Sequence, residues 1–506
     1  MSEVSPSADE MPLPPTSGKP MTGSSMRADI FHLGRQSAAY VIGHLATRAV
    51  SFLLLPLYTN VLAPGDLGIL SLTFAFTGFG MIVYNMGLDS ALMRYYVGES
   101  PDRQREVLTS VYLTLLMIGL ALTVLLFGFR RQLAAAILGS YNADWIAILA
   151  AIMFLDTLWT IPMHLYRAHG RPAPYVSLSL LNVSITMGLN ILLVAHYGMG
   201  VEGALLSNLA ASGVLFMFTF PGALRRMWPL RFSPAILRSL LAFGLPLMVA
   251  GLFTMTIELA DRYLLRWLTD IETVGLYSTG YKLGLLMLIL VMGFNMGWQP
   301  FFLKRGIEAG AQPVFARITT YMVVAMGTLL LAIGAWIDDL VRLPLGSITL
   351  VGSEYWSATG IVPVVMLGYL LFGLYVLQLP GIHLTARTRW VMLFRGSGAL
   401  TNIICNLLLI PIWGAMGAAL ATCITFAVMA LITFLITRRF YPVAYEWGRL
   451  VRIFSLLALG IAGLYIFPSN LWRNLALTFL IPVGLGISGA ANPDERRNLL
   501  RLFRRP

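Results

Sequence analysis

The chain has 506 residues, of which 58% are hydrophobic and 11% are charged, and its formal net charge is +12. Soluble domains carry about 25% charged residues, so this composition excludes a protein that has water as its main solvent. The two cysteines, Cys405 and Cys423, lie in apolar segments, and the sequence indicates no disulfide framework.

The chain begins with a polar tail and continues with long apolar runs. Residues 1–28 are rich in Ser, Pro and Gly, which predicts a disordered tail without a secretory signal. A membrane-spanning helix needs about 20 mostly apolar residues. Fourteen segments qualify: 36–62, 66–92, 107–129, 145–166, 172–196, 200–222, 238–262, 272–300, 314–336, 357–379, 388–411, 414–437, 449–467 and 471–489. Unbroken apolar runs exclude the alternating pattern of a β-barrel, so the predicted fold class is an all-α polytopic membrane protein.

The basic residues predict the orientation of these helices. Most of the 35 Lys and Arg residues fall in one alternating set of loops and in the C-terminal tail. By the positive-inside rule, this asymmetry places both termini in the cytoplasm. The net charge therefore reflects topology, not nucleic-acid binding, and basic residues beside the membrane are expected to meet anionic lipids.

Two segment pairs indicate an internal repeat. Leu67–Ser71 resembles Val274–Ser278, and Asn190–Gly198 resembles Asn406–Gly414, with a small-residue motif after each of the latter two. The pairs occur in the same order at similar separations, and each places a turn at the same point of a six-helix unit. Parallel repeats of this kind form transporters with the site between the halves. Two duplicated bundles that serve as an anchor remain the alternative.

The sequence resembles the oligosaccharide and polysaccharide flippases, O-antigen flippases included, of the multidrug/oligosaccharidyl-lipid/polysaccharide exporter superfamily. The segments that carry the resemblance lie between residues 32 and 440: Pro56–Thr59, Gly65–Gly68, Gly87–Ala91, Arg94–Tyr96, Phe243–Pro246, Asp261–Tyr263, Gly275–Tyr277, Gln299–Phe301, Glu354–Trp356 and Asn406–Gly414. The resemblance implies two six-helix lobes, two additional C-terminal helices, and undecaprenyl-diphosphate-linked glycans as cargo in the bacterial cytoplasmic membrane.

The expected organisation has six parts. They are a cytoplasmic tail (1–28), a first six-helix lobe (29–224), a cytoplasmic linker (225–237), a second six-helix lobe (238–440), two further spans (441–489) and a basic cytoplasmic tail (490–506). We expect the two lobes to move about a central site by alternating access.

Charged residues inside the spans predict where that site lies. Arg48, Lys282 and Arg395 fall well inside their predicted helices and come from both halves of the repeat. Charges at this depth usually face a bundle interior or a wet cavity. Arginine guanidinium groups bind phosphate oxygens in pairs, so Arg48 and Arg395 are the predicted diphosphate ligands, with Lys282 beside them. The alternative is a structural ion pair, such as Arg48 with Asp156.

Other polar residues complete the candidate site. Tyr281, Asn295, Trp298 and Gln299 are candidate sugar contacts, although packing is the plainer interpretation of the aromatic side chains. Asp156, Glu258 and Asp261 are candidates for ion coupling or charge pairing, and Asp261 has Arg262 and Arg266 as neighbouring partners. The sequence predicts no catalytic or metal-binding residues and no cofactor, so an ion gradient or the membrane potential would supply the energy.

Three alternatives stay open at this level. A multidrug exporter shares the architecture but handles organic cations, which favour an acidic cavity, and a lipid II-type flippase would handle a related cargo. A membrane-embedded glycan-transferring enzyme would need catalytic carboxylates or His in a large loop. No nucleophile elbow, Walker loop or metal-ligand spacing is present in the sequence. Beyond the lipid-linked oligosaccharide, the expected partners are anionic lipids and the polysaccharide polymerase and glycosyltransferases of one pathway, with no nucleic acid.

Overall fold

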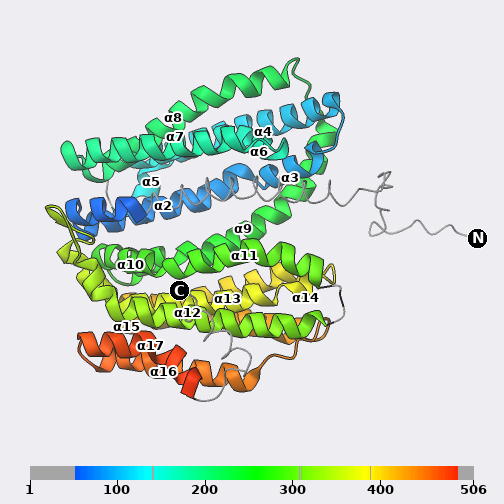
Figure 1. The fold of residues 1–506 in the computed structure, drawn as a ribbon. Helices are drawn as coiled ribbons and strands as arrows, with labels where there is room; N and C mark the ends of the chain where they lie inside the picture. Colours follow the sequence, from blue (N-terminus) through cyan, green and yellow to red (C-terminus); the bar gives the residue numbers. More distant parts are fainter. Residues whose placement is uncertain (1–51, 140–141, 307, 309, 388, 488–506) are drawn as a thin grey trace, which may run out of the picture.

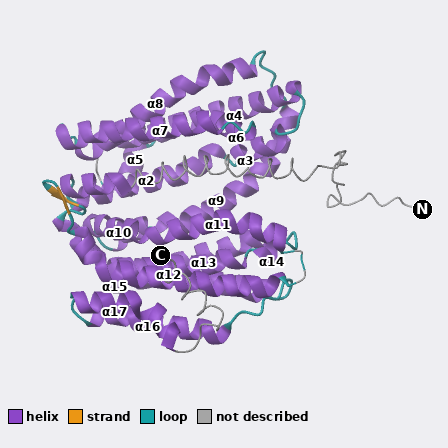
Figure 2. Cartoon of the chain, in the orientation of Figure 1, coloured by secondary structure: helices purple, strands orange, loops and turns teal. Residues whose placement is uncertain are grey.

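The computed structural model describes residues 52–139, 142–306, 308, 310–387 and 389–487. These residues are almost entirely helical, apart from a hairpin of two short antiparallel strands, β1 (Pro344–Leu345) and β2 (Ile348–Thr349) (Figure 2). The predicted all-α fold class is therefore confirmed. Both predicted tails and most of the first predicted span lie outside the described residues, and the described part of that span is a helix at Phe52–Val61.

The first half of the chain continues with elements that run back and forth in the upper part of Figure 1. They are α2 (Pro64–Asn85), α3 (Leu88–Tyr96), α4 (Pro101–Gly128), α5 (Arg130–Leu138), α6 (Asp144–Ala168), α7 (Pro172–Asn190), the π-helix η1 (Ile191–His196) and α8 (Gly200–Met227).

The second half forms the lower part of Figure 1, and the last two helices pack against its outer side. Its elements are α9 (Pro234–Leu268), α10 (Ile271–Gly284), α11 (Leu286–Arg305), α12 (Ala311–Val341), the 3₁₀ helix η2 (Ser353–Ile361), α13 (Val362–Gln378), α14 (Pro380–His383), α15 (Arg389–Thr437), α16 (Trp447–Ile466) and α17 (Leu471–Ile487). α16 and α17 both contact α12, so they attach to the second half alone.

The count of fourteen spans is not confirmed. Within the described residues, eleven helical segments are long and apolar enough to cross a membrane, and the protein is a multi-pass membrane protein. One of these segments, Arg389–Thr437, covers two predicted spans that meet at Gly414, where the backbone is not helical. The predicted helix 66–92 is two helices, because Met86 and Gly87 both adopt the left-handed conformation between α2 and α3. The predicted helix 272–300 is interrupted at Leu285.

The bundle has two distinct ends, called the hairpin end and the basic end. The hairpin end contains residues 61–64, the start of α10 and the β1–β2 hairpin, and the basic end contains the connections 97–100, 169–171 and 228–233 (Figure 1). Between the two halves, α2 contacts α10 at the hairpin end. Helix α9 lies between the halves, with α2, α3 and α4 on one side and α15 on the other. α9 therefore joins the halves as a shared wall and not only as the first helix of the second half.

A glycine with positive φ stands at the repeated turn in both halves. Gly198 and Gly414, the last residues of the two matched segments, have φ of 64° and 53°. A side chain at Gly203 would lie 3.1 Å from the backbone of Leu193, and one at Gly417 would lie 2.2 Å from the backbone oxygen of Leu409. Each turn thus needs one glycine for a left-handed conformation and a second for close helix packing.

Candidate functional site

A buried ion pair on α9 contacts α10. Arg262 donates a hydrogen bond from Nη1 to Asp261 Oδ1 over 2.9 Å, and Tyr277 on α10 donates its hydroxyl to the other oxygen of the same carboxylate. Asp261 has no exposed surface and Arg262 is 8% exposed. Of the two partners that the sequence offered for Asp261, the structure places Arg262 in contact. Asp261 is thus held by a cation and a hydroxyl.

The guanidinium of Arg262 also faces aromatic rings. Its Cζ lies 4.9 Å from the ring centroid of Tyr281, and the Tyr281 hydroxyl is 2.6 Å from that of Tyr369 on α13. A cation over an aromatic face at this distance is an attractive contact. Tyr281, a predicted sugar contact, therefore belongs to a packed polar network that links α9, α10 and α13.

Lys282 lies where the second half meets the first. Its Nζ is 5.8 Å from the ring of Tyr58, in the helix Phe52–Val61, and the Tyr58 hydroxyl donates to Asn190 on α7 over 2.7 Å. Arg262 is near enough to Lys282 to repel it electrostatically. The described residues supply no ion pair for Lys282. Lys282 therefore lies at the boundary between the halves, in contact with an aromatic ring.

Arg395 lines a cavity of about 280 Å³ within the second half. Its Nη1 donates to Thr254 Oγ1 over 3.0 Å, which holds the guanidinium against α9. The wall includes Glu258 on α9, Asn295 on α11, His383 on α14 and a group of aromatic rings from α13 and α15: Tyr369, Phe372, Tyr375 and Phe426. No acid in the described part of the chain forms an ion pair with Arg395. The cavity thus combines a cation with hydrogen-bonding groups and ring faces.

A second cavity, of about 210 Å³, adjoins the first one. Its wall includes Arg262, Tyr281 and Phe52, and it shares Glu258, Leu288 and Tyr369 with the Arg395 cavity. Across both cavities and the adjacent Lys282, three cations (Arg262, Lys282 and Arg395) stand against two acids (Asp261 and Glu258). The described interior of the second half therefore carries an excess of positive charge.

The other predicted site residues lie in different surroundings. Asn295 lines the Arg395 cavity. The ring of Trp298 is buried among aromatic side chains, with centroids 5.0 Å away at Phe315 and 5.7 Å away at Phe302. Its neighbour Gln299 is exposed and lines neither cavity. In this conformation, Trp298 is a packing residue, while Asn295 faces the cavity.

Asp156 lies apart from these cavities, in the first half. Its Oδ1 accepts hydrogen bonds from Trp159 Nε1 over 2.7 Å and from Ser212 Oγ on α8 over 2.5 Å. The bond from Ser212 joins α6 to α8. Arg48 lies outside the described residues, so its place beside the cavities and its alternative pairing with Asp156 both stay predictions.

Several cavity residues were not predicted as site residues, notably Thr254, Arg262, Tyr369 and His383. Thr254, Glu258 and Arg262 recur every fourth residue, which places them on one face of α9. This spacing was present in the sequence. The predicted seventh span ends at residue 262, whereas α9 continues to Leu268, so Arg262 lies inside the helix and not at its end.

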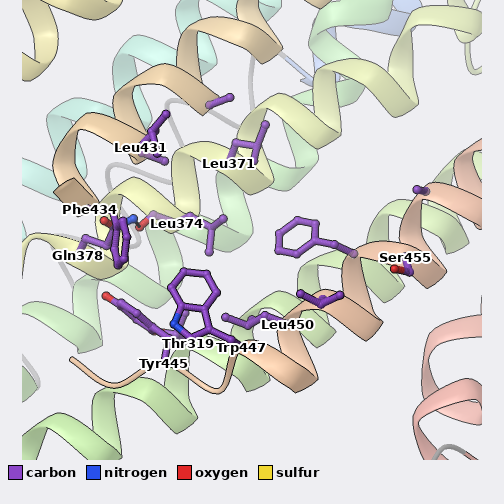
Figure 3. Close-up of a pocket in the computed structure, with 15 residues that line it drawn as sticks. Thr319, Leu371, Leu374, Gln378, Leu431, Phe434, Tyr445, Trp447, Leu450 and Ser455 are labelled. Atoms are coloured by element: carbon purple, nitrogen blue, oxygen red, sulfur yellow. Dashed lines mark hydrogen bonds between the residues drawn. The ribbon is translucent and has the colours of Figure 1, made fainter. Parts of the chain in front are cut away.

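A third cavity is of a different kind. It measures about 570 Å³ and lies between α13, α15 and α16, where Leu371, Leu431 and Leu450 contribute to an apolar wall (Figure 3). None of its lining residues carries a charge. It uses faces of α13 and α15 other than those that line the Arg395 cavity, and it offers nothing to bind an anion. Within the described residues, no group of three or more His, Cys, Asp or Glu could hold a metal ion.

Comparison with solved structures finds transporters of one fold. A lipid II flippase MurJ in an inward closed conformation is 16% identical, with a TM-score of 0.67, over 91% of this chain and 99% of that chain. A multidrug resistance MATE family transporter of the MOP superfamily matches in its inward-facing conformation at 15% identity and a TM-score of 0.62, over 78% of this chain and 93% of its own. A structure of a multidrug resistance MATE family transporter of the MOP superfamily in an outward-facing conformation is 16% identical, with a TM-score of 0.58, over 81% of this chain and 95% of that chain. These likenesses establish a MurJ- and MATE-like fold.

The family of the chain follows from its sequence. No curated protein matches the chain significantly. A family model described as "Polysaccharide biosynthesis protein" matches residues 33–304, which is more than half of the chain. The protein therefore belongs to the polysaccharide biosynthesis protein family and has the fold of the MurJ and MATE transporters.

Proposed function

We propose that the protein is a flippase that carries undecaprenyl-diphosphate-linked oligosaccharide across the bacterial cytoplasmic membrane by alternating access. The observation that carries this proposal is the excess of cations at the two adjoining cavities of the second lobe. Family membership supports a role in polysaccharide biosynthesis, and the fold is one that transporters use. The lipid tail stays in the bilayer while the head group crosses between the lobes.

The chemistry of the cavity suits a diphosphate. An arginine side chain presents paired N–H donors that match two phosphate oxygens, and its charge persists at every physiological pH. Thr254 orients the guanidinium of Arg395, so less conformational freedom is lost when an anion binds. Lys282 and Arg262 continue the positive potential toward the hairpin end, and Arg48 is proposed to add to it from the first lobe. Asn295 and Tyr375 supply hydrogen bonds and a ring face to the sugar next to the diphosphate.

The direction of transport follows from the proposed orientation. The basic end faces the cytoplasm, both termini lie there, and the hairpin end faces outward. An inside-negative potential then favours outward movement of an anion by about 2.3 kcal/mol for each charge at 100 mV. Glu258 touches both cavities, so it is the proposed carrier of a coupling ion. No cofactor is required.

The competing functions fit the cavity less well. A drug exporter of organic cations would bind its cargo best in an acidic cavity, and the cation excess disfavours this cargo. A lipid II-type cargo shares the diphosphate and differs in the sugar, so it remains the second candidate. An enzyme would need catalytic groups outside the membrane. The proposed partners are anionic lipids at the basic end and the polymerase and glycosyltransferases of the same pathway.

The test uses purified protein in liposomes with a labelled lipid-linked oligosaccharide, and it measures the movement of the label between leaflets. We expect Arg395→Gln to slow transport at least tenfold and Arg395→Lys to retain part of it, because lysine keeps the charge but loses the paired donors. The matched control is Arg389→Gln, which removes an exposed arginine from the first residue of the same helix. Equal transport by Arg395→Gln and Arg389→Gln would overturn the proposal.

A further inference from the structure

The two members of the first repeated pair meet each other at the hairpin end. Gly68 is the fifth residue of α2, and a side chain there would lie 2.1 Å from the backbone oxygen of Ile271, the first residue of α10. Gly275 is the fifth residue of α10, and a side chain there would lie 1.9 Å from the backbone oxygen of Pro64, the first residue of α2. The contact is reciprocal. We call it the glycine seam.

Neutral hydrogen bonds continue this contact at the end of the first helix. The side-chain amide of Asn60 pairs with the backbone of Thr349, donating to its oxygen over 2.7 Å and accepting from its nitrogen over 3.3 Å. Thr59 Oγ1 accepts from Gly352 N over 3.1 Å, and the Tyr355 hydroxyl donates to Leu62 O over 2.8 Å. These bonds, here called the Asn60 latch, join the first lobe to the hairpin and η2.

These contacts are weak enough to break and re-form during a transport cycle. Each neutral hydrogen bond contributes only modestly to stability, because water replaces it when it breaks. Within the described residues, no ion pair crosses between α2 and α10 or between the first helix and η2. The sum for the four hydrogen bonds of the latch is therefore of the same order as the driving force that a membrane potential applies to an anionic cargo.

The seam also lies in line with the charged interior. Lys282 is on α10, seven residues after Gly275, and it contacts Tyr58, which directly precedes the latch residues Thr59 and Asn60. The seam and the latch are thus connected to the charged interior through Lys282 and Tyr58.

We infer that the glycine seam and the Asn60 latch form the gate at the hairpin end, which parts to release the cargo and closes again to reset the transporter. This inference deepens the proposed function and rests on it. The two glycines act as a matched pair: they let two helices approach to backbone contact, so that closure of the gate needs no side chain to move aside. A methyl group at either position would push the two helices apart and prevent the gate from closing fully.

The first experiment locks the gate. In a chain without Cys405 and Cys423, Gly65→Cys and Ile271→Cys place two thiols across the seam, because a side chain at Gly65 would lie 3.6 Å from Ile271 Cγ2. We expect oxidation to abolish transport of the labelled lipid-linked oligosaccharide, reduction to restore it, and each single cysteine to leave it unaffected. Full transport by the crosslinked protein would overturn the gate.

The second experiment needs no cargo, so it separates failure of the gate from failure of the proposed function. Ile289→Cys reports access to the second cavity from the hairpin side by reaction with a membrane-impermeant maleimide. We expect severalfold faster labelling with Gly68→Ala or Gly275→Ala than with the control Gly65→Ala, whose added methyl group makes only ordinary contacts. Equal labelling in folded Gly68→Ala and Gly65→Ala would overturn the role of the seam, whatever the transported molecule is.

Discussion

The two lobes share a repeat but place different chemistry in their interiors. In the first lobe, Asp156 is held by an indole N–H and a hydroxyl, and it joins α6 to α8. In the second lobe, Asp261 is paired with Arg262, and Lys282 and Arg395 add further charge beside two cavities. A glycine with positive φ ends the repeated segment in both lobes. The two lobes therefore share a scaffold, while among the described residues the charged groups that line the two cavities all belong to the second lobe.

The largest expected effect comes from breaking the charge pair of the second lobe. Asp261→Ala leaves the buried Arg262 without its counter-charge, which should lower the free energy of unfolding by about 3–5 kcal/mol. Thermal unfolding in detergent measures the loss. The double variant Asp261→Ala/Arg262→Leu should recover part of it, because the unpaired charge is gone. A double variant no more stable than Asp261→Ala would contradict this account of the pair.

The corresponding change in the first lobe should cost less. Asp156→Leu leaves the Trp159 N–H without an acceptor, and an unsatisfied buried donor costs about 1–3 kcal/mol. Asp156→Asn keeps an acceptor oxygen and should lose less stability and retain transport within about threefold, since the carboxylate acts as a hydrogen-bond acceptor. Unfolding and liposome transport are the two measurements. A tenfold loss of transport in a stable Asp156→Asn variant would show that the first lobe also handles charge.

The repeated asparagines offer a sharper comparison of the lobes. Both side chains donate to the backbone four residues earlier, at Thr186 for Asn190 and at Asn402 for Asn406, but only Asn190 also accepts the hydroxyl of Tyr58. Asn190→Ala should therefore destabilise the protein by about 1 kcal/mol more than Asn406→Ala. Tyr58→Phe is the control, since it should remove most of this difference. If Asn190→Ala and Asn406→Ala lower the free energy of unfolding equally in the protein that retains Tyr58, the hydrogen bond to Tyr58 contributes nothing to stability.

The smallest effect is expected within the tyrosine network. Tyr281→Phe removes one hydroxyl–hydroxyl bond to Tyr369 but keeps the ring that faces Arg262, so the cost should be about 0.5–1.5 kcal/mol. Tyr281→Leu also removes the cation–π contact and should cost more. Unfolding of the two variants separates the ring from the hydroxyl. Transport close to that of the unmodified protein in Tyr281→Phe would place the Tyr281 hydroxyl outside the cargo contacts.

The predictions from sequence were most accurate where a single residue type decides the structure. Apolar runs of sufficient length predicted helices that can span a membrane, and the matched segments predicted a turn at the same point of each six-helix unit. Span boundaries were less accurate. Helices 66–92 and 272–300 each appear as two elements, since a break at Met86–Gly87 or Leu285 interrupts a continuous apolar run without changing its composition.

For the candidate site too, the sequence identified some features and not others. Depth along a helix identified Lys282 and Arg395 as charges inside the membrane, and both lie at or beside the cavities. Depth could not identify which face of a helix each residue occupies. Trp298 and Asn295 are neighbours on α11, yet one is packed among rings and the other faces the Arg395 cavity. Arg262 was assigned to a helix end, while the fold buries it against α10.

The sequence by itself determined that the protein lies in a membrane, that it is helical, that it contains a repeat, and which residue types could bind an anion. These properties follow from composition and from local backbone preference, which need no knowledge of neighbours. Only the tertiary structure decided that Gly68 and Gly275 face each other across the lobes, that Arg395 is held by Thr254, and that Asp261 accepts the hydroxyl of Tyr277 on α10. Such pairings join segments distant in the chain, and helix packing, not local preference, brings them together.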